Sequence, residues 1–158
     1  MAGELRLPNQ GETVVLMGWV DSRRDLGGLV FVDLRDHTGV VQVVLDPEGE
    51  STVPINDLRL ETVLAVQGVV SARPESMCNP EKPTGDIEVQ VSRAEILSRV
   101  EPLPIQVDDD KVTEAMKLKY RYIDLRSPKL QRSLRLRHQA AQLARRFLSD
   151  AGFIEVET

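Results

Sequence analysis

The stretch Gly28–Leu45, GLVFVDLRDHTGVVQVVL, is rich in Val, Leu and Phe on both sides of a short polar segment. This composition predicts two β-strands, Gly28–Asp36 and Gly39–Leu45, because β-branched and aromatic side chains favour extended backbone. The residues that join them, Asp36-His37-Thr38-Gly39, suit the tight turn of a hairpin. We therefore expect an antiparallel strand pair in this stretch.

Further segments of similar composition lie on either side of this pair. The turn Asp25–Gly28 leads into it, a short helix is expected over Pro54–Glu61, and a proline-rich loop is expected over Pro74–Gly85. The three additional strands are Thr13–Arg24, Thr62–Arg73 and Asp86–Leu97. Three strands, a helix and two strands, closed into a barrel, is the order of the OB-fold, and closure removes exposed strand edges. We expect an all-β, five-stranded OB barrel over residues 1–100, with an open β-sandwich as the alternative.

The chain changes character after the fifth strand. Pro102, Pro104 and the acidic run Asp108–Asp110 indicate a linker over residues 101–117. The segment Lys117–Arg126 that follows mixes basic and aromatic residues. Residues 118–158 are then expected to form a second region.

A long helix is the main feature expected in that second region. Ser127 can cap it, Pro128 suits its first position, and Gly152 is placed to end it. After the helix, Phe153–Glu157 alternates like a new strand. One helix and one strand have no core of their own, so we expect residues 118–158 to be the opening of a larger α+β domain that is cut short.

Composition and single residues exclude several classes of protein. The chain has 158 residues, 41% hydrophobic and 28% charged, as in ordinary globular proteins, without an apolar run of membrane-spanning length or a secretory signal. Cys78 is the only cysteine, which excludes an intrachain disulfide and indicates a reducing compartment. His37 and His138 have no second ligand nearby in the sequence, so no metal site is expected.

Charge is distributed unevenly along the chain. The net charge is −5, but residues 1–99 hold nine basic and sixteen acidic residues, whereas residues 100–158 hold eleven basic and nine acidic ones. A barrel of net charge −7 is a poor sequence-independent binder of nucleic acid, because such binding relies on a broad basic surface. Any nucleic acid is therefore expected to meet a local patch with specific base contacts.

Strand alternation identifies that patch. Val30, Val32 and Leu34 fall on one face of the second strand and are expected in the core, whereas Leu29, Phe31, Asp33 and Arg35 fall on the other face. The same alternation places Val41, Val43 and Leu45, and Ile87, Val89 and Val91, inside the barrel. Gln42 and Glu88 then share the outer surface with Phe31, and Arg23 and Arg24 lie at its rim.

These side chains have the chemistry that reading single-stranded RNA requires. An aromatic ring such as Phe31 can stack on an unpaired base, which contributes about 1–3 kcal/mol per base. The amide of Gln42 both donates and accepts, the carboxylate of Glu88 accepts from base N–H groups, and arginine holds phosphates. Two plainer readings stay open: Phe31 covers the barrel edge or a neighbouring domain, and the polar residues are merely solvated.

At this point the sequence resembles the anticodon-binding domain of aspartyl-tRNA synthetases of the bacterial and organellar type, followed by motif 1 of class II synthetases. The resemblance spans nearly the whole chain. It rests on the segments Gly18–Val20, Arg23–Asp36, Gly39–Val44, Asn79–Glu81, Thr84–Val89, Leu118–Arg126, Phe147–Leu148 and Gly152–Thr158.

The resemblance implies roles for individual residues. In that family the aromatic matching Phe31 stacks on the central anticodon base and the position matching Gln42 hydrogen-bonds it, while those matching Arg24 and Glu88 lie near the first base. Supporting RNA contacts are expected from Arg23, Leu26, Arg35, Arg73 and Asn79. Family members often have an Asn near Met77 that reads the third base, and here the loop is Ser76-Met77-Cys78-Asn79. Leu26 resembles enzymes that charge only the aspartate tRNA; the other type often has His there.

The family also implies an activity, the ATP-dependent joining of L-aspartate to its tRNA. The parent enzyme is expected to use ATP and Mg²⁺, to be a homodimer, and to act in the cytoplasm or an organellar matrix, with no membrane or DNA partner. These 158 residues are expected to bind tRNA through the anticodon-binding domain. Because they lack motifs 2 and 3, they are expected to hold no catalytic residue, metal or cofactor and to form no product. The alternatives are the same part of a lysyl or asparaginyl relative, and a non-enzymatic OB module for single strands or a protein partner.

Overall fold

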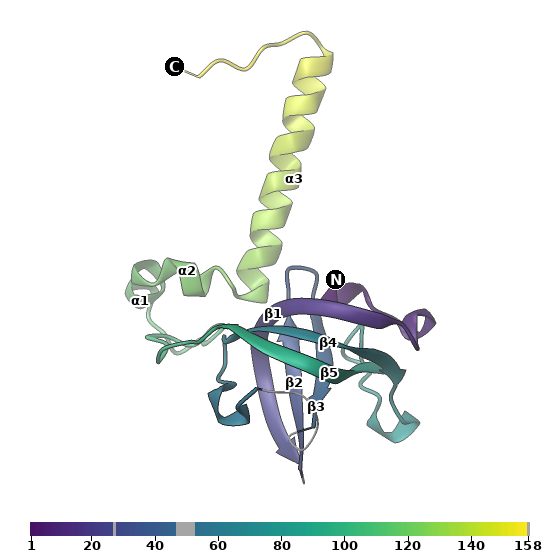
Figure 1. Ribbon diagram of the computed structural model, residues 1–158. Helices are drawn as coiled ribbons and strands as arrows, with labels where there is room; N and C mark the ends of the chain where they lie inside the picture. The colour runs from purple at the N-terminus through teal and green to yellow at the C-terminus, as the bar shows by residue number, and fades with distance from the viewer. Residues whose placement is uncertain (27, 47–52, 158) are drawn as a thin grey trace. The chain divides into compact units, whose positions relative to one another are not determined.

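A computed structural model describes the chain except for residues 27, 47–52 and 158. The chain divides into two compact units, Met1–Glu101 and Pro102–Thr158. All five strands belong to the first unit, and the long helix belongs to the second (Figure 1).

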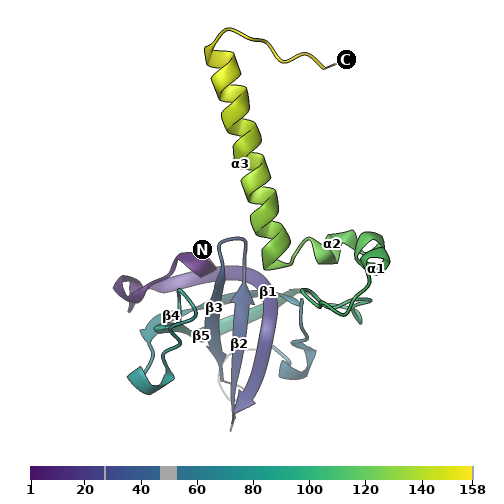
Figure 2. The ribbon, with the colours of Figure 1, turned by 180° about the vertical axis from the view of Figure 1, so that it is seen from behind.

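Five strands build the first unit. They are β1 (Thr13–Leu26), β2 (Leu29–Arg35), β3 (Val40–Leu45), β4 (Val63–Ala72) and β5 (Ile87–Ser98). They close into a barrel in the order β1-β2-β3-β5-β4, with β3 and β5 parallel and all other neighbours antiparallel; Figures 1 and 2 show it from opposite sides. Closure confirms the predicted OB barrel over the open sandwich. Where a short helix was predicted, the structure has a single 3-10 turn, η3 (Ile55–Asp57).

The predicted apolar faces fill the barrel. Val30, Val32 and Leu34 of β2 are each at most 1% exposed, as are the three residues predicted to face inward on β3. Ile87 and Val89 of β5 are fully buried, and Val91 packs against the same core. The interior is therefore the continuous apolar cluster that strand alternation predicts.

The connections follow the expected turns with small shifts. β1 runs two residues farther than predicted, to Leu26, and Gly28 turns the chain into β2 with φ +99°, a backbone conformation that favours glycine. The second predicted turn is confirmed, because the Asp36 N–H donates to the carbonyl of Gly39 at 2.9 Å. At Gly68 the sheet requires glycine for lack of space, since a Cβ there would lie 2.3 Å from the Gln90 carbonyl oxygen.

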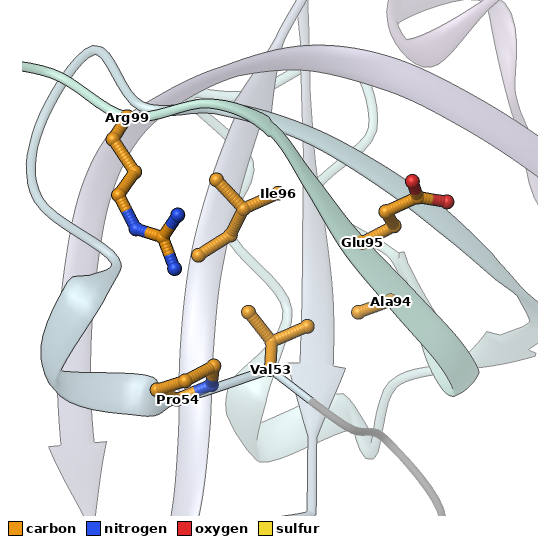
Figure 3. Close-up of a pocket in the computed structure, with 6 residues that line it drawn as sticks. All are labelled: Val53, Pro54, Ala94, Glu95, Ile96 and Arg99. Carbon is orange, nitrogen blue, oxygen red and sulfur yellow. The ribbon is translucent and has the colours of Figure 1, made fainter.

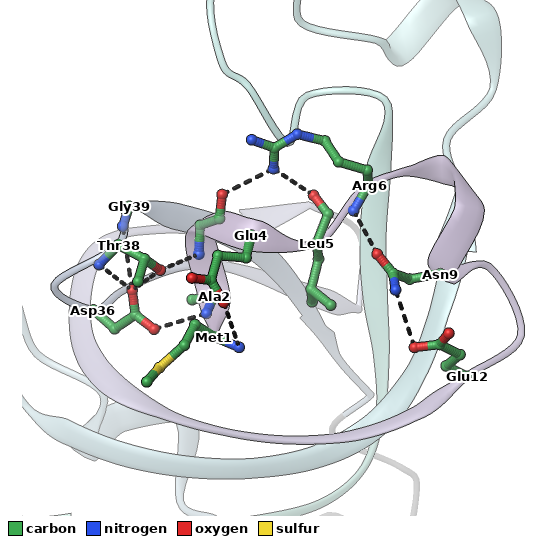
Figure 4. A network of polar contacts seen from close by, with 11 residues as sticks. Met1, Ala2, Glu4, Leu5, Arg6, Asn9, Glu12, Asp36, Thr38 and Gly39 are labelled. Atoms are coloured by element: carbon green, nitrogen blue, oxygen red, sulfur yellow. Dashed lines mark hydrogen bonds and ion pairs between the residues drawn. The ribbon is translucent and has the colours of Figure 1, made fainter.

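The Asp36 carboxylate fastens the N-terminal segment to the β2–β3 turn (Figure 4). This segment includes two 3-10 turns, η1 (Ala2–Glu4) and η2 (Leu7–Asn9). The carboxylate accepts hydrogen bonds from the backbone N–H groups of Ala2 (2.7 Å), Thr38 (2.7 Å) and Gly39 (3.2 Å) and from the Thr38 hydroxyl. Burial alone would raise the pKa of Asp36, but these hydrogen bonds outweigh it and the pKa is lowered.

Replacing Asp36 with alanine is expected to lower the free energy of unfolding at pH 7 by about 1–3 kcal/mol, because it leaves several donors without their charged acceptor. A lowered pKa in the folded state means that this contribution is fully present above 3.8, the ordinary pKa of an aspartate side chain, and disappears as pH falls through the folded pKa. Urea unfolding of both proteins between pH 7 and pH 2 measures the difference. Glu95→Ala, which removes an exposed carboxylate from β5, is the control. A difference that does not shrink in acid would contradict a role for the charge.

The second unit contains the long helix α3 (Pro128–Asp150) and two short helices, α1 (Glu114–Lys119) and α2 (Arg121–Asp124). The predicted cap of α3 is confirmed, because the Ser127 hydroxyl accepts from the Leu130 N–H at 3.2 Å with Pro128 at the first position. The helix is followed by Gly152 with φ +87°. Among the described residues, no helix is both long and apolar enough to cross a bilayer.

Two features of the second unit differ from the sequence prediction. The helices α1 and α2 were not expected; Thr113 caps α1 by accepting from the Met116 N–H at 3.4 Å. Phe153–Glu157 was expected to be a strand, and this was wrong, because the segment has no strand assignment. Alternation supplies two faces, but a strand also needs a neighbouring strand, and among the described residues the paired strands are those of the barrel. The Phe153 N–H instead donates to the Leu148 carbonyl of α3 at 3.0 Å.

Candidate nucleic-acid interface

The register of the sheet places the four predicted anticodon contacts on neighbouring strands. Arg24 of β1 lies opposite Phe31 of β2, and Asp33 of β2 lies opposite Gln42 of β3. β3 then pairs in parallel with β5, which carries Glu88. Residues directly opposite each other share a face of the sheet, so Phe31 and Arg24 are neighbours, with Gln42 one strand farther on. We refer to Arg24, Phe31, Gln42 and Glu88 as the outer cluster.

Three members of the outer cluster form a hydrogen-bonded chain across three strands. Arg24 Nη2 donates to Gln42 Oε1 at 2.9 Å, and Gln42 Nε2 donates to Glu88 Oε2 at 2.9 Å. This orients the amide, with its oxygen toward the arginine and its nitrogen toward the carboxylate. Because an amide oxygen accepts two hydrogen bonds and an amide nitrogen donates two, one acceptor and one donor position remain for a base edge.

The outer cluster is more covered than alternation alone predicts. Gln42 is only 6% exposed, while Phe31 is half-buried and Arg24 is exposed. Gln42 is hydrogen-bonded on both sides by long polar side chains, those of Arg24 and Glu88. A ligand would therefore meet the ring and the guanidinium first and the more covered amide after them.

Arg73 lies next to Glu88 of the outer cluster. Its side chain is 6% exposed, its Nε donates to the Ile87 carbonyl at 2.8 Å, and it lies 3.8 Å from the Glu88 carboxylate. Gln90 donates to the other oxygen of Glu88 at 2.8 Å. Both oxygens of Glu88 are thus fixed in direction, which suits a group that must accept hydrogen bonds from a particular base edge.

Sequence reasoning missed one residue beside the outer cluster, Lys82. Its Nζ donates to Asp33 Oδ2 at 2.7 Å, and the Ser22 hydroxyl donates to the same oxygen at 2.6 Å. Burial would raise the pKa of Asp33, but these two hydrogen bonds and the charge of Lys82 lower it. The sequence held only part of the signal: a carboxylate on the face of Phe31 favours a nearby cation, and Lys82 is the only basic residue in Pro74–Gly85, but the pairing itself depends on the closed barrel.

The other predicted RNA contacts lie apart from the hydrogen-bonded chain. Arg23 pairs across the sheet with Val32, a core residue, so it lies on the opposite face of β1 from Arg24. Arg35 bridges Asp21 and Glu61. Leu26 is 63% exposed at the end of β1. Asn79 lies in the loop before β5, where its Oδ1 accepts from the Glu81 N–H at 3.0 Å.

Other potential sites in the described residues offer little chemistry. No group of three or more His, Cys, Asp or Glu side chains is arranged to hold a metal ion in the part of the chain that the structure describes, and Cys78 is exposed. A shallow pocket at the end of β5 is lined by Val53, Pro54, Ala94, Glu95, Ile96 and Arg99 (Figure 3). Its lining includes no member of the outer cluster, and the Arg99 guanidinium turned toward it pairs with Asp57 at 3.3 Å.

Comparison with known proteins yields two family matches and many relatives. Residues 14–97 match the family described as OB-fold nucleic acid binding domain, and residues 113–158 match tRNA synthetases class II (D, K and N). An aspartate–tRNA(Asp/Asn) ligase of Caldanaerobacter subterraneus subsp. tengcongensis is 49% identical over 100% of this chain and 27% of its own length. An aspartate–tRNA ligase of Oceanobacillus iheyensis is 46% identical with the same coverage.

A solved structure resembles the chain in three dimensions. The asparaginyl-tRNA synthetase from Pyrococcus horikoshii complexed with asparaginyl-adenylate aligns with a TM-score of 0.82 and 27% identity, covering 98% of this chain and 35% of that one. The chain thus spans about a quarter of the length of the curated relatives that it matches. It belongs to the OB-fold nucleic acid binding domain family, joined to the start of a class II tRNA synthetase domain.

Proposed function

We propose that this chain is the anticodon-binding part of an aspartate–tRNA ligase and that the outer cluster reads the anticodon. The observation that carries this proposal is the oriented chain Arg24–Gln42–Glu88 beside the half-buried ring of Phe31. It offers a stacking surface, a donor, an acceptor and a cation within one patch. The relatives named aspartate–tRNA ligase, at 46–49% identity over the whole chain, support the same reading.

The charge of the barrel supports selective reading over general attraction to RNA. Residues 1–99 carry sixteen acidic and nine basic residues, so phosphate attraction alone gives little affinity. Recognition then depends on stacking and on base edges, which distinguish one loop from another. In this proposal residues 1–100 bind the anticodon and residues 118–158 begin the catalytic domain. Residues 101–117 are the linker between these two domains.

The activity of the whole enzyme forms part of the proposal. It would be the ATP- and Mg²⁺-dependent attachment of L-aspartate to its tRNA by a cytoplasmic homodimer. ATP use follows from the class II synthetase family matched by residues 113–158. The second candidate function is an asparaginyl-tRNA synthetase, which the likeness to the Pyrococcus horikoshii structure favours. The sequence identity to that protein is only 27%, however.

Titration with anticodon stem-loops tests the proposal. The labelled GUC loop is expected to bind more tightly than each of its single-base variants and than a loop with a lysine anticodon, as measured by fluorescence anisotropy at fixed ionic strength. The largest loss is expected for substitution of the central base, which would stack on Phe31. The GUU loop separates aspartate-only recognition from recognition of both aspartate and asparagine anticodons. Equal affinity for all loops would overturn anticodon reading and favour a general single-strand binder.

A further inference from the structure

The loop between β4 and β5 is a compact structure fastened to the barrel at two points. Within it, the Asn79 N–H donates to the Gly85 carbonyl at 2.9 Å, and the Gly85 N–H donates to the Lys82 carbonyl at 2.9 Å. Gly85 is needed for this closeness, because a Cβ would lie 1.8 Å from the Asn79 carbonyl oxygen. The first anchor is Thr84, whose hydroxyl donates to the Val40 carbonyl of β3 at 2.6 Å and which is 1% exposed.

The second anchor is the ion pair of Lys82 with Asp33. It joins residues 49 positions apart, and the side chain of Asp33 is only 7% exposed against 34% for Lys82. Asp33 lies directly opposite Gln42 and two positions from Phe31 on the same face of β2. The ammonium group therefore holds the loop at the edge of the outer cluster. The second oxygen of Asp33, Oδ1, is buried and accepts no hydrogen bond from any described residue, so the compensation for this charge falls on Oδ2, through Lys82 and the Ser22 hydroxyl.

We propose that Lys82 is a positioning residue for RNA recognition, which fixes the β4–β5 loop as a preformed wall beside Phe31 and Gln42. This rests on the proposed function, because it assumes that the outer cluster binds an RNA loop. If the loop is already ordered in the unbound protein, RNA binding does not have to include the entropic cost of ordering the loop residues. Without the ion pair, the Thr84 anchor remains, and each binding event must order the Lys82 end of the loop again.

Substitutions that change the charge distinguish this positioning role from general electrostatic attraction, because the two predict opposite effects on RNA affinity. Asp33→Asn removes a negative charge from the barrel, so general attraction to RNA would increase and affinity would rise. Positioning requires the opposite result, a weaker complex, because the ion pair is lost. Lys82→Met breaks the same pair and also removes a cation, while Lys82→Arg keeps a cation able to pair with Asp33. Arg93→Met is the matched control, since it removes an exposed cation of β5 that lies opposite Gln67 of β4.

The experiment measures the dissociation constant for the GUC stem-loop and the hydrogen exchange of the loop amides in the unbound, full chain. Lys82→Met and Asp33→Asn are expected to weaken binding about tenfold, the ordering cost of one or two side chains, and to speed exchange at Asn79 and Gly85. Lys82→Arg is expected to restore most of the affinity. The control is expected to change binding by less than about threefold, as loss of one remote charge allows. Thermal unfolding followed by Trp19 fluorescence verifies that each variant is folded.

Three outcomes would overturn the proposal. Tighter binding by Asp33→Asn would mean that the charge acts on RNA only at a distance. Unchanged exchange at Asn79 and Gly85 together with weaker binding by Lys82→Met would make Lys82 a direct RNA contact. A loss in Lys82→Met no larger than in Arg93→Met would leave it no special role. Failure of the proposed function is distinguishable from all three, because the unaltered chain would then show no preference for the GUC loop.

Discussion

Phe31→Ala is expected to weaken binding of the GUC stem-loop by about 1–3 kcal/mol, roughly 5- to 150-fold in the dissociation constant, because it removes the stacking surface for one base. The ring is half-buried on the outer face of β2, opposite Arg24 and Val44, and the core lies on the other side of the strand. Its loss should therefore affect RNA binding far more than folding. Anisotropy titration of the labelled loop measures the change.

Two variants make this result specific to stacking. Phe31→Tyr keeps an aromatic face and is expected to bind nearly as well as the unaltered chain. Met17→Ala removes another partly exposed apolar side chain, 60% exposed on β1 and paired with Ala65 of β4, and should leave binding unchanged. Equal losses for Phe31→Tyr and Phe31→Ala would show that the ring is not used for stacking. So would an alanine variant that binds normally.

The barrel was predictable because its sequence signals are local. Alternation over Val30–Leu34 and Val41–Leu45 identifies the buried face without any knowledge of the fold, and the turn residues between them determine which strands are neighbours. The parallel pairing of β3 with β5 is a property of the whole barrel, and no single segment contains it. It followed only from the order of elements that is typical of the OB-fold.

The outer cluster was predictable as a set of positions but not as a set of contacts. Alternation placed Phe31, Gln42 and Glu88 outside, yet it cannot specify that Gln42 is held between Arg24 and Glu88 and is nearly buried. Burial of a polar group on an outer face depends on how far neighbouring long side chains reach, which the period of the strand does not encode.

The loop contact of Lys82 shows the same limit at longer range. Its partner Asp33 lies 49 positions away, and only the closed barrel brings the loop to β2. In the second unit, the expected strand Phe153–Glu157 failed for a related reason: alternation describes one strand, whereas a sheet requires two. Contacts between residues far apart in the sequence were therefore the hardest features to predict from the sequence alone.

Leu34→Ala is expected to lower the free energy of unfolding by about 2–5 kcal/mol, because the leucine is fully buried and the truncation leaves a cavity that the barrel cannot close. Leu34 lies opposite Val20 of β1 and Val41 of β3, both also fully buried, so the space is bounded by strands that are hydrogen-bonded on either side. Urea unfolding followed by the fluorescence of Trp19, the only tryptophan, measures the loss in the barrel itself.

Leu29→Ala is the matched control, since this leucine lies on the outer face of the same strand and is 41% exposed. Its replacement is expected to cost no more than about 0.5 kcal/mol, as at other surface positions. Comparable losses at the two leucines would contradict the assignment of inner and outer faces. If Leu34→Ala destabilises the barrel while Phe31→Ala weakens RNA binding, then two residues three positions apart on β2 serve folding and recognition separately. That separation follows from the two faces of a strand, one of which fills the core while the other is available to a ligand.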